Sequence, residues 1–381
     1  MSSMSSSGLA AEIKSKTGQF VLVLQGGGAL GAYQAGIYEA LHEAGIEPDW
    51  TVGTSIGAIN ASLIAGNPPE DRVARLKQFW AKVEQNSLFD RLPLPSAIQK
   101  ALANASVVNS GVAGFFAPNP VAFLGPDVLL GAEAAGYYST RPLETTLGSL
   151  VDFDYLARGP VRLTVGAANV RTSQMRYFDS REMPLSVKHV LASGALPPAF
   201  PAIRIGDALY WDGGILSNTP VEVVFDDMPR RNSLVVAVHL WNPDGADPKT
   251  IGAVNHRLKD LQYASRTSTH ISRQRQIHRL RHIVAELAAR LPPEAREDKA
   301  IREMAAYGCL TNMHVVRLLA PDLDHADESK DIDFSREGIA ARWRAGLEDA
   351  RRMIAQAPWE KPVDPLAGFH LHEMNPERGI L

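Results

Sequence analysis

Ser55 lies in the pentapeptide Gly53-Thr54-Ser55-Ile56-Gly57, which has the G-x-S-x-G pattern of a nucleophile elbow. In such an elbow the glycines permit a sharp turn between a strand and a helix, and the serine hydroxyl projects from the sheet edge. The alternative interpretation is a serine that caps the following helix in a tightly packed turn. The pattern makes Ser55 a candidate nucleophile, with Gly53 and Gly57 as the residues that permit the turn.

A second glycine-rich segment, Gly26-x-Gly28-x-x-Gly31, follows an apolar run and precedes a helical pattern. It matches the dinucleotide-binding fingerprint, which also requires an acidic residue at the end of the second strand. Asp49 is at about the right distance, but it begins that strand and therefore lies at the wrong edge of the sheet. The backbone amides of Gly26, Gly27 and Gly28 would favour an anion, either a pyrophosphate or a developing oxyanion.

A serine nucleophile needs a group that takes its proton, and two candidates follow predicted strands. Asp212 ends a strand and is followed by Gly213 and Gly214, which leaves room for a substrate beside its carboxylate. The alternative is an aspartate that stabilises the turn itself. His239 ends a later strand, so a triad of Ser55, Asp212 and His239 is conceivable. Against the triad, Ser55 follows only the second strand, earlier than an α/β-hydrolase places its nucleophile.

The elements that must position these residues alternate between strand and helix. A strand is predicted over 20–25 and a helix over 32–45, followed by a second strand over 49–52 and a small-residue helix over 58–66. Later strands are predicted over 161–168, 208–211 and 234–240. Strand, turn and helix in this order indicate an α/β fold with a parallel central sheet.

In these motifs and their order the chain resembles the patatin-like phospholipases, a family of lipid acyl hydrolases, in its bacterial type with a helical C-terminal extension. The resemblance rests on the glycine loop at 26–31, the elbow at 53–57 and the Asp-Gly-Gly turn at 212–214. The segment Ala-Ser-Gly-Ala-Leu-Pro-Pro-Ala-Phe-Pro at 192–201 is similar to the loop ahead of the family's aspartate. Together these motifs cover roughly residues 19–240.

The resemblance implies a three-layer α/β/α fold and a Ser–Asp dyad that cleaves acyl esters of phospholipid or related lipid through a covalent acyl-enzyme. By this match Ser55 is the nucleophile and Asp212 is the base. The amides of Gly26, Gly27 and Gly28 are the candidate oxyanion donors. The resemblance implies no cofactor, and the spacing of possible ligands suggests no metal. A carboxylate of ordinary pKa is a poor match for a serine hydroxyl, so either burial raises the pKa of Asp212 or the oxyanion loop lowers more of the barrier.

The chain departs from the family pattern at Ala29-Leu30, where many members carry a basic residue. Two other functions stay open. One is a nucleotide-dependent oxidoreductase that uses the glycine loop, and the other is a lipid-binding regulator with a catalytically inactive hydrolase fold. Hydrolase and acyltransferase share an acyl-enzyme, so the motifs do not choose between them. The Phe-, Leu-, Pro- and Gly-rich stretches 89–98 and 112–125 are typical of ordinary loop and short helix. The functional alternative is a mobile mouth over an apolar substrate site.

Length, composition and charge are those of an ordinary globular protein. The chain has 381 residues, 45% of them apolar, with 39 basic and 42 acidic residues and a net charge of −3. The single cysteine, Cys309, fits a reducing compartment. Residues 1–18 show neither a signal peptide nor a spanning segment and predict a flexible tail. We therefore expect a cytoplasmic protein, with peripheral membrane contact as an option.

The predicted catalytic domain, residues 19–243, is followed by a mainly helical extension over 244–381. A helical stretch at 256–291 carries eight basic and two acidic residues. This helix can be a solvated face, a surface that binds anionic membrane, or a dimerisation surface. The last interpretation allows a homo-oligomer. Few aromatic residues lie between its arginines, so nucleic-acid binding is not expected. His370 and His372 could form a metal pair, but we expect solvated tail histidines.

Overall fold

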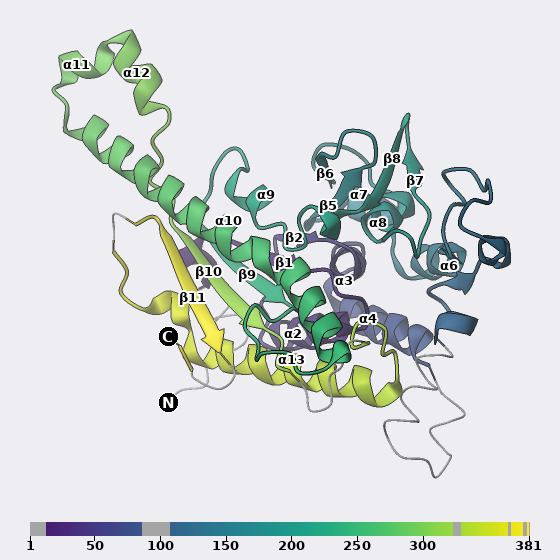
Figure 1. Ribbon diagram of the computed structural model, residues 1–381. Coiled ribbons are helices and arrows are strands. Elements are labelled where there is room, and N and C mark those ends of the chain that lie inside the picture. Colours follow the sequence, from purple (N-terminus) through teal and green to yellow (C-terminus); the bar gives the residue numbers. More distant parts are fainter. Residues whose placement is uncertain (1–12, 86–106, 323–328, 365–366, 376–378, 381) are drawn as a thin grey trace.

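A mainly parallel sheet runs through the computed structural model, which describes residues 13–85, 107–322, 329–364, 367–375 and 379–380 (Figure 1). In order across this sheet the strands are β12 (Gly379–Ile380), β11 (Phe369–Asn375), β10 (Met313–Leu319), β9 (Ser233–His239), β1 (Gln19–Leu24), β2 (Trp50–Gly53), β5 (Arg162–Asn169), β8 (Ala208–Asp212) and β7 (Ile203–Ile205). Strand β6 (Met175–Asp179) pairs with β5 beside this path. A separate small hairpin joins β3 (Ala117–Pro118) and β4 (Tyr138–Ser139).

The strands from β11 to β5 run parallel, and the antiparallel pairs lie toward the two edges. Strand β1 shows why the centre of the sheet is apolar on both sides. Its residues Phe20, Leu22 and Leu24 belong to the larger hydrophobic core, whereas Val21 and Val23 belong to the core on the opposite face. A parallel strand covered on both faces needs such a continuous apolar run, and that run predicted the strand.

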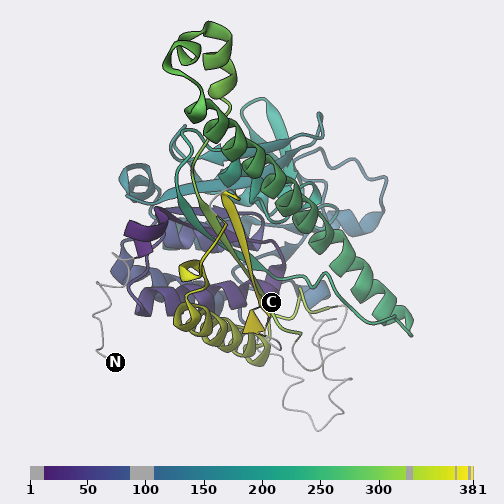
Figure 2. The same ribbon diagram turned by 90° about the vertical axis from the view of Figure 1, so that its left-hand side faces the viewer.

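Helices cover both faces of the sheet. The helices and short helical turns are η1 (Gly28–Gly31), α2 (Ala32–Glu43), α3 (Ile56–Ala65), α4 (Pro69–Val83), η3 (Pro120–Leu124), α6 (Arg141–Leu150), α7 (Phe153–Arg158), α8 (Val187–Ser193), η4 (Gly213–Ile215), α9 (Glu222–Phe225), α10 (Ile251–Arg290), α11 (Pro293–Glu297), α12 (Lys299–Ala305), α13 (Arg336–Gln356) and η5 (Pro358–Glu360). Helices α2, α3, α4 and α13 pack in the larger core, and α9 and α10 pack on the other face (Figures 1 and 2). The predicted three-layer α/β/α fold with a helical C-terminal region is confirmed.

Helix α13 from the C-terminal region packs tightly on α2. A Cβ at Gly36 would lie 1.9 Å from the Trp343 carbonyl oxygen, and one at Gly346 would lie 2.0 Å from the Tyr33 carbonyl oxygen. Only glycine therefore permits this approach of the two helix backbones. The far half of α10 behaves differently, because it projects from the body together with α11 and α12 (Figures 1 and 2).

The C-terminal region also supplies strands to the central sheet. Strand β10 pairs with β9 along seven residues, and β11 continues the sheet beyond β10. The expectation of solvated tail histidines is wrong, because His370 and His372 lie in β11 and are each 8% exposed. The predicted boundary at 243/244 stays a prediction, since strands from both sides of it share one sheet.

The chain is ordered earlier than the predicted tail suggests. Residues 13–17 are helical and Ile13 is buried in the larger core, whereas residues 1–12 lie outside the described part of the chain. Of the two stretches with a mouth as their functional alternative, 89–98 also lies outside the described residues. Within the described residues, no helix combines the length and the apolar character needed to cross a membrane.

Candidate active site

Ser55 lies at the turn between β2 and α3, as the elbow pattern predicted. Its backbone has φ 57° and ψ −125°, a left-handed conformation that non-glycine residues rarely adopt. The turn is tight, since a Cβ at Gly57 would lie 2.1 Å from the Leu24 carbonyl oxygen. Gly53 faces the same turn, where a Cβ would lie 2.3 Å from the Gly57 carbonyl oxygen. The strained serine is the arrangement that a G-x-S-x-G elbow requires.

Ser193 at the end of α8 supports the elbow. The Ser55 amide donates to the Ser193 backbone oxygen at 3.1 Å and to its Oγ at 3.0 Å. The Ser193 hydroxyl in turn donates to the Gly166 carbonyl oxygen at 2.6 Å. Two residues further on, the Ala195 carbonyl accepts from the Asp212 amide at 2.9 Å. The segment 192–201 therefore positions both candidate catalytic residues.

Asp212 ends β8 with its side chain buried, at 3% residue exposure. Burial raises the pKa of the Asp212 carboxyl from 3.8 to about 6. The Gly214 amide, which donates to the carboxylate at 2.7 Å, and the nearby Ser55 hydroxyl both lower this pKa, but by less than burial raises it. Gly213 packs against the Gly166 carbonyl in the same turn. Of the two alternatives for this carboxylate, a raised pKa is therefore present, and its cause is desolvation.

In the glycine loop between β1 and α2, one of the three amides predicted as oxyanion donors already has a partner. The Gly26 amide donates to the Asn218 carbonyl oxygen at 3.2 Å, so it is occupied and cannot serve as an oxyanion donor. Its own carbonyl accepts from Trp241 Nε1 at 2.7 Å and from Asn218 Nδ2 at 3.1 Å. Within the described part of the chain, the amides of Gly27 and Gly28 donate no hydrogen bond. The candidate donors are therefore Gly27 and Gly28 alone.

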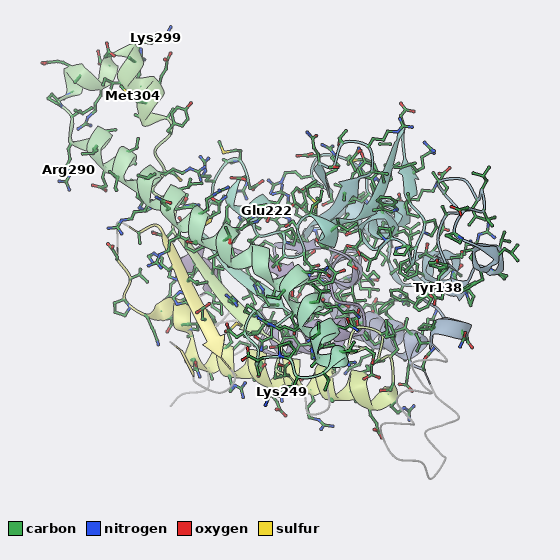
Figure 3. All side chains as sticks on the ribbon, in the orientation of Figure 1. Tyr138, Glu222, Lys249, Arg290, Lys299 and Met304 are labelled. Carbon is green, nitrogen blue, oxygen red and sulfur yellow. The ribbon has the colours of Figure 1, made fainter. Side chains whose placement is uncertain are left out.

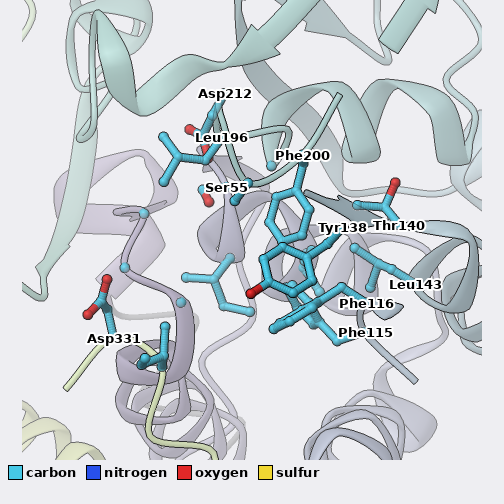
Figure 4. A pocket seen from close by; sticks show the side chains of 18 of the residues that line it. Ser55, Phe115, Phe116, Tyr138, Thr140, Leu143, Leu196, Phe200, Asp212 and Asp331 are labelled. Atoms are coloured by element: carbon cyan, nitrogen blue, oxygen red, sulfur yellow. The ribbon is translucent and has the colours of Figure 1, made fainter. Parts of the chain in front are cut away.

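A largely apolar cavity of about 310 Å³ contains Ser55 and Asp212. Figure 4 shows Ser55 close to the Asp212 carboxylate, with aromatic side chains on one side of the serine and Asp331 on the other. The aromatic side chains of the cavity are Phe115, Phe116, Tyr138, Phe200, Trp241, Tyr263 and Phe334. Asp212 and Asp331 supply the only charged side chains among its described lining residues. The stretch 112–125 contributes Phe115 and Phe116.

The C-terminal region forms part of this cavity. Tyr263 comes from α10, and Asp331, Ile332 and Phe334 come from the segment that precedes α13. Burial raises the pKa of Tyr263, and the nearby carboxylates of Asp212 and Asp331 raise it further. The Asp331 carboxylate forms an ion pair with Lys259 of α10 at 2.7 Å. The C-terminal region therefore contributes to the lining of the cavity that contains Ser55 and Asp212.

The rival site residues lie elsewhere. His239 ends β9 as predicted, but its side chain is buried, does not line the cavity, and has no hydrogen-bond partner at Nε2. The pKa of His239 is lowered to about 3, mainly by burial and to a smaller extent by the positive charge of Arg317. Asp49 accepts from the Phe20 amide and pairs with Lys14, at the opposite end of β1 and β2 from the glycine loop. Within the described residues, no group of three or more histidines, cysteines or carboxylates could hold a metal ion.

The site contains four residues that the sequence analysis did not single out: Ser193, Asn218, Trp241 and Asp331. Ser193 lies in the segment 192–201, whose resemblance to the family's loop predicted no role for this residue. The other three contact the glycine loop from more than 190 positions away along the chain, and no local pattern reveals such contacts. Gly31, named with the motif, packs against Ile56 at the start of α3 and so joins the loop to the elbow.

Comparison with models of known families identifies the family of the chain. The patatin-like phospholipase model matches residues 22–225, more than half of the chain, and a second model described as patatin phospholipase matches residues 261–366. The chain belongs to the patatin-like phospholipase family. The resemblance drawn from the glycine loop, the elbow and the Asp-Gly-Gly turn is thereby confirmed, and the match supports an ester-hydrolysing enzyme.

Among curated proteins, the chain is 27% identical over 207 residues to an uncharacterized NTE family protein of Mycobacterium tuberculosis, covering 54% of this chain and 28% of that protein. It is 39% identical over 67 residues to a triacylglycerol lipase of Schizosaccharomyces pombe, covering 18% of this chain and 14% of the lipase. Among solved structures, VipD from Legionella pneumophila shares a TM-score of 0.39 at 15% identity, covering 89% of this chain and 67% of VipD. The chain thus spans about a quarter of the length of the first curated relative.

Proposed function

We propose that the chain is a serine acyl hydrolase that cleaves acyl ester bonds of phospholipid or a related lipid. The observation that carries the proposal is the strained Ser55 close to the buried carboxylate of Asp212 (Figure 4). Burial raises the pKa of this carboxyl to about 6. Both side chains face an apolar cavity. A base whose pKa lies near neutrality is well matched to general-base catalysis at physiological pH.

In the first half-reaction, Ser55 Oγ attacks the acyl carbonyl carbon while its proton passes to the Asp212 carboxylate. The tetrahedral oxyanion forms beside the glycine loop, where the free amides of Gly27 and Gly28 can donate to it. Collapse breaks the ester C–O bond, and Asp212 returns the proton to the leaving alkoxide. The products of this half-reaction are an alcohol and an acyl-Ser55 ester.

In the second half-reaction, water attacks the acyl-Ser55 carbonyl carbon and gives a proton to Asp212. Collapse releases the fatty acid and returns the proton to Ser55 Oγ. An alcohol in place of water would yield a new ester, so product analysis decides between hydrolase and acyltransferase. Burial of Asp212 without a cationic partner among the lining residues keeps its pKa high enough for this cycle.

The shape and lining of the cavity favour an acyl chain as the bound group. Its volume of about 310 Å³ is at the lower end of the usual range for ligand pockets, roughly 300–1,000 Å³. The aromatic side chains Phe115, Phe116 and Phe200 lie together on one side of Ser55 (Figure 4). A single acyl chain would pack against these rings with its ester group at Ser55. Such a ligand fits both the apolar lining and the volume of the cavity.

The test is labelling by a fluorophosphonate probe, which reacts with activated serines, together with hydrolysis of a panel of acyl esters. Wild-type protein should be labelled, Ser55→Ala should not, and Asp212→Asn should be labelled far more slowly. Ser173→Ala is the matched control, because Ser173 also has a positive φ but lies in an exposed turn outside the cavity. Labelling of the control should equal that of wild type.

The rivals predict different results. A nucleotide-dependent oxidoreductase would bind a dinucleotide and be indifferent to Ser55→Ala. A catalytically inactive lipid-binding regulator would bind lipid without being labelled and without turnover. Folded wild-type protein that is not labelled and cleaves no ester would refute the hydrolase. The cytoplasmic location, the contact of the basic helix at 256–291 with anionic membrane, and the oligomeric state stay predictions.

A further inference from the structure

An apolar, exposed surface lies next to the cavity. It consists of Val121, Phe123, Leu124, Val128, Leu129 and Tyr137, and we refer to these six residues as the apolar rim. Leu129 is fully exposed, Leu124 is 78% exposed and Phe123 is 57% exposed. Large apolar side chains gathered on the surface at this density indicate a contact surface rather than ordinary solvent exposure.

The apolar rim is continuous with the cavity wall. The Tyr137 amide donates to the Pro198 carbonyl oxygen at 3.1 Å, and the next residue, Tyr138, donates to the Ala199 carbonyl oxygen at 2.8 Å. Tyr138 and Ala199 both line the cavity. The Phe123 and Tyr137 rings lie 5.5 Å apart, which joins the two ends of the rim. Whatever contacts the rim is therefore held next to the aromatic side of the cavity.

The charge of this segment identifies the partner. Between residues 107 and 140 the only charged residues are Asp127 and Glu133, and no lysine or arginine is present. Glu133 is already paired with Arg204 at 3.2 Å. A surface that binds anionic headgroups by charge needs basic residues with unpaired charge. This segment has no basic residue of its own, and the Arg204 beside it is already paired with Glu133. Its composition matches the boundary between headgroups and acyl chains of an uncharged lipid surface.

We propose that the apolar rim inserts into the surface of a lipid bilayer and places the mouth of the cavity at the level of the acyl chains. The choice of lipid rests on the proposed function, because the cavity beside the rim is the one assigned to an acyl chain. Binding is driven by burial of apolar side chains, so it needs no anionic lipid and is insensitive to salt. The basic helix is not required for it.

The experiment measures sedimentation of the full-length chain with phosphatidylcholine vesicles, at low and high salt. Wild-type protein should bind at both. The double variant Leu124→Asp/Leu129→Asp should bind at least about tenfold more weakly, because burying one leucine is worth roughly a factor of ten in partition. The matched control is Leu280→Asp/Leu287→Asp on the far half of α10, where the two leucines are 56% and 61% exposed. Figure 3 shows Tyr138 and the projecting part of the chain, marked by Met304, at opposite ends of the molecule.

Three outcomes would overturn the proposal: equal binding by wild type and the rim variant, loss of binding in the α10 control instead, or wild-type binding that requires anionic vesicles and disappears in high salt. Hydrolysis of a short, water-soluble ester separates the rim from the chemistry. The rim variant should retain that activity while losing hydrolysis of vesicle lipid. If the wild-type protein did not hydrolyse the soluble ester, the proposed function would be refuted. Vesicle binding by wild type and rim variant would still test the role of the apolar rim.

Discussion

The backbone carbonyl of Asp331 accepts a hydrogen bond of 2.8 Å from the backbone amide of Ala29, although the two residues are 302 positions apart. Gly28 lies beneath the same carbonyl, since a Cβ there would approach the Asp331 oxygen to 2.2 Å. The segment before α13 thus rests on the glycine loop. The geometry of the amides of Gly27 and Gly28 depends on how firmly that segment is held.

Lys330 holds the segment through a buried ion pair with Asp260 of α10 at 2.9 Å, with side-chain exposures of 5% and 7%. We expect Lys330→Met to destabilise the fold by about 3–5 kcal/mol, because the buried Asp260 would keep only the His256 ring, at 3.5 Å, beside its carboxylate. Urea unfolding measures this loss. The double variant Lys330→Met/Asp260→Leu should recover most of it. If the single variant unfolded at the wild-type urea concentration, the pair would not be holding the segment.

The pH dependence should follow Asp212. Its carboxyl must be ionised to accept the proton of Ser55, so kcat/KM should rise with pH up to about 6 and then level off. Below that pH, activity should fall about tenfold per unit. Rates on a soluble ester from pH 4.5 to 8.5 measure the profile. A midpoint at the ordinary aspartate value near 4 would show that burial does not set the pKa of the base.

Asp212→Asn should stabilise the protein while abolishing its activity. Because the folded-state pKa of Asp212 is raised above its unfolded value of 3.8, the folded state binds the proton more tightly, and stability is lost as pH rises from about 4 to about 6. The loss amounts to at most about 3 kcal/mol at neutral pH. Thermal unfolding at pH 7 should therefore show a higher Tm for Asp212→Asn, and at pH 4 the difference should shrink. A lower Tm at pH 7 would contradict the desolvation argument.

Trp241 positions the glycine loop through the hydrogen bond of 2.7 Å from its Nε1 to the Gly26 carbonyl oxygen. Trp241→Phe keeps an aromatic side chain, though a smaller one, and removes this donor, so we expect kcat to fall about tenfold with little change in KM. Trp211→Phe is the matched control, because Trp211 Nε1 has no hydrogen-bond partner. Steady-state kinetics on a soluble ester should separate the two variants. If both variants had the same kinetic constants, the hydrogen bond from Trp241 would not be needed to position the glycine loop.

Phe115 lies in the aromatic side of the cavity, with its ring centroid 5.6 Å from that of Phe334. Phe115→Leu lengthens the space available to an acyl chain, so the preferred chain should become longer. One or two methylenes in an apolar pocket are worth roughly 10–200-fold in kcat/KM. A series of esters of increasing acyl length measures the shift. Phe178→Leu removes a buried ring outside the cavity lining and should leave the preference unchanged.

Much of the catalytic core was predictable because its signals are local. An uninterrupted apolar run predicts β1, and small residues at fixed spacing predict the elbow at Ser55 and the turn at Asp212. The occupancy of the Gly26 amide was not predictable, because it depends on Asn218, which the fold brings from 192 positions away. Strand β11 was missed for another reason. His370 and His372 make its sequence read as polar, and only pairing with β10 buries them.

The order of strands in the sheet limits how the chain can be divided. A chain cut after residue 243 would retain every side chain assigned to catalysis, yet it would uncover the whole edge of β9, whose seven residues are all buried. It would also strip α13 from α2. An uncovered apolar strand edge invites pairing with another molecule and aggregation. We therefore expect a chain shortened in this way to aggregate instead of folding as a free catalytic domain.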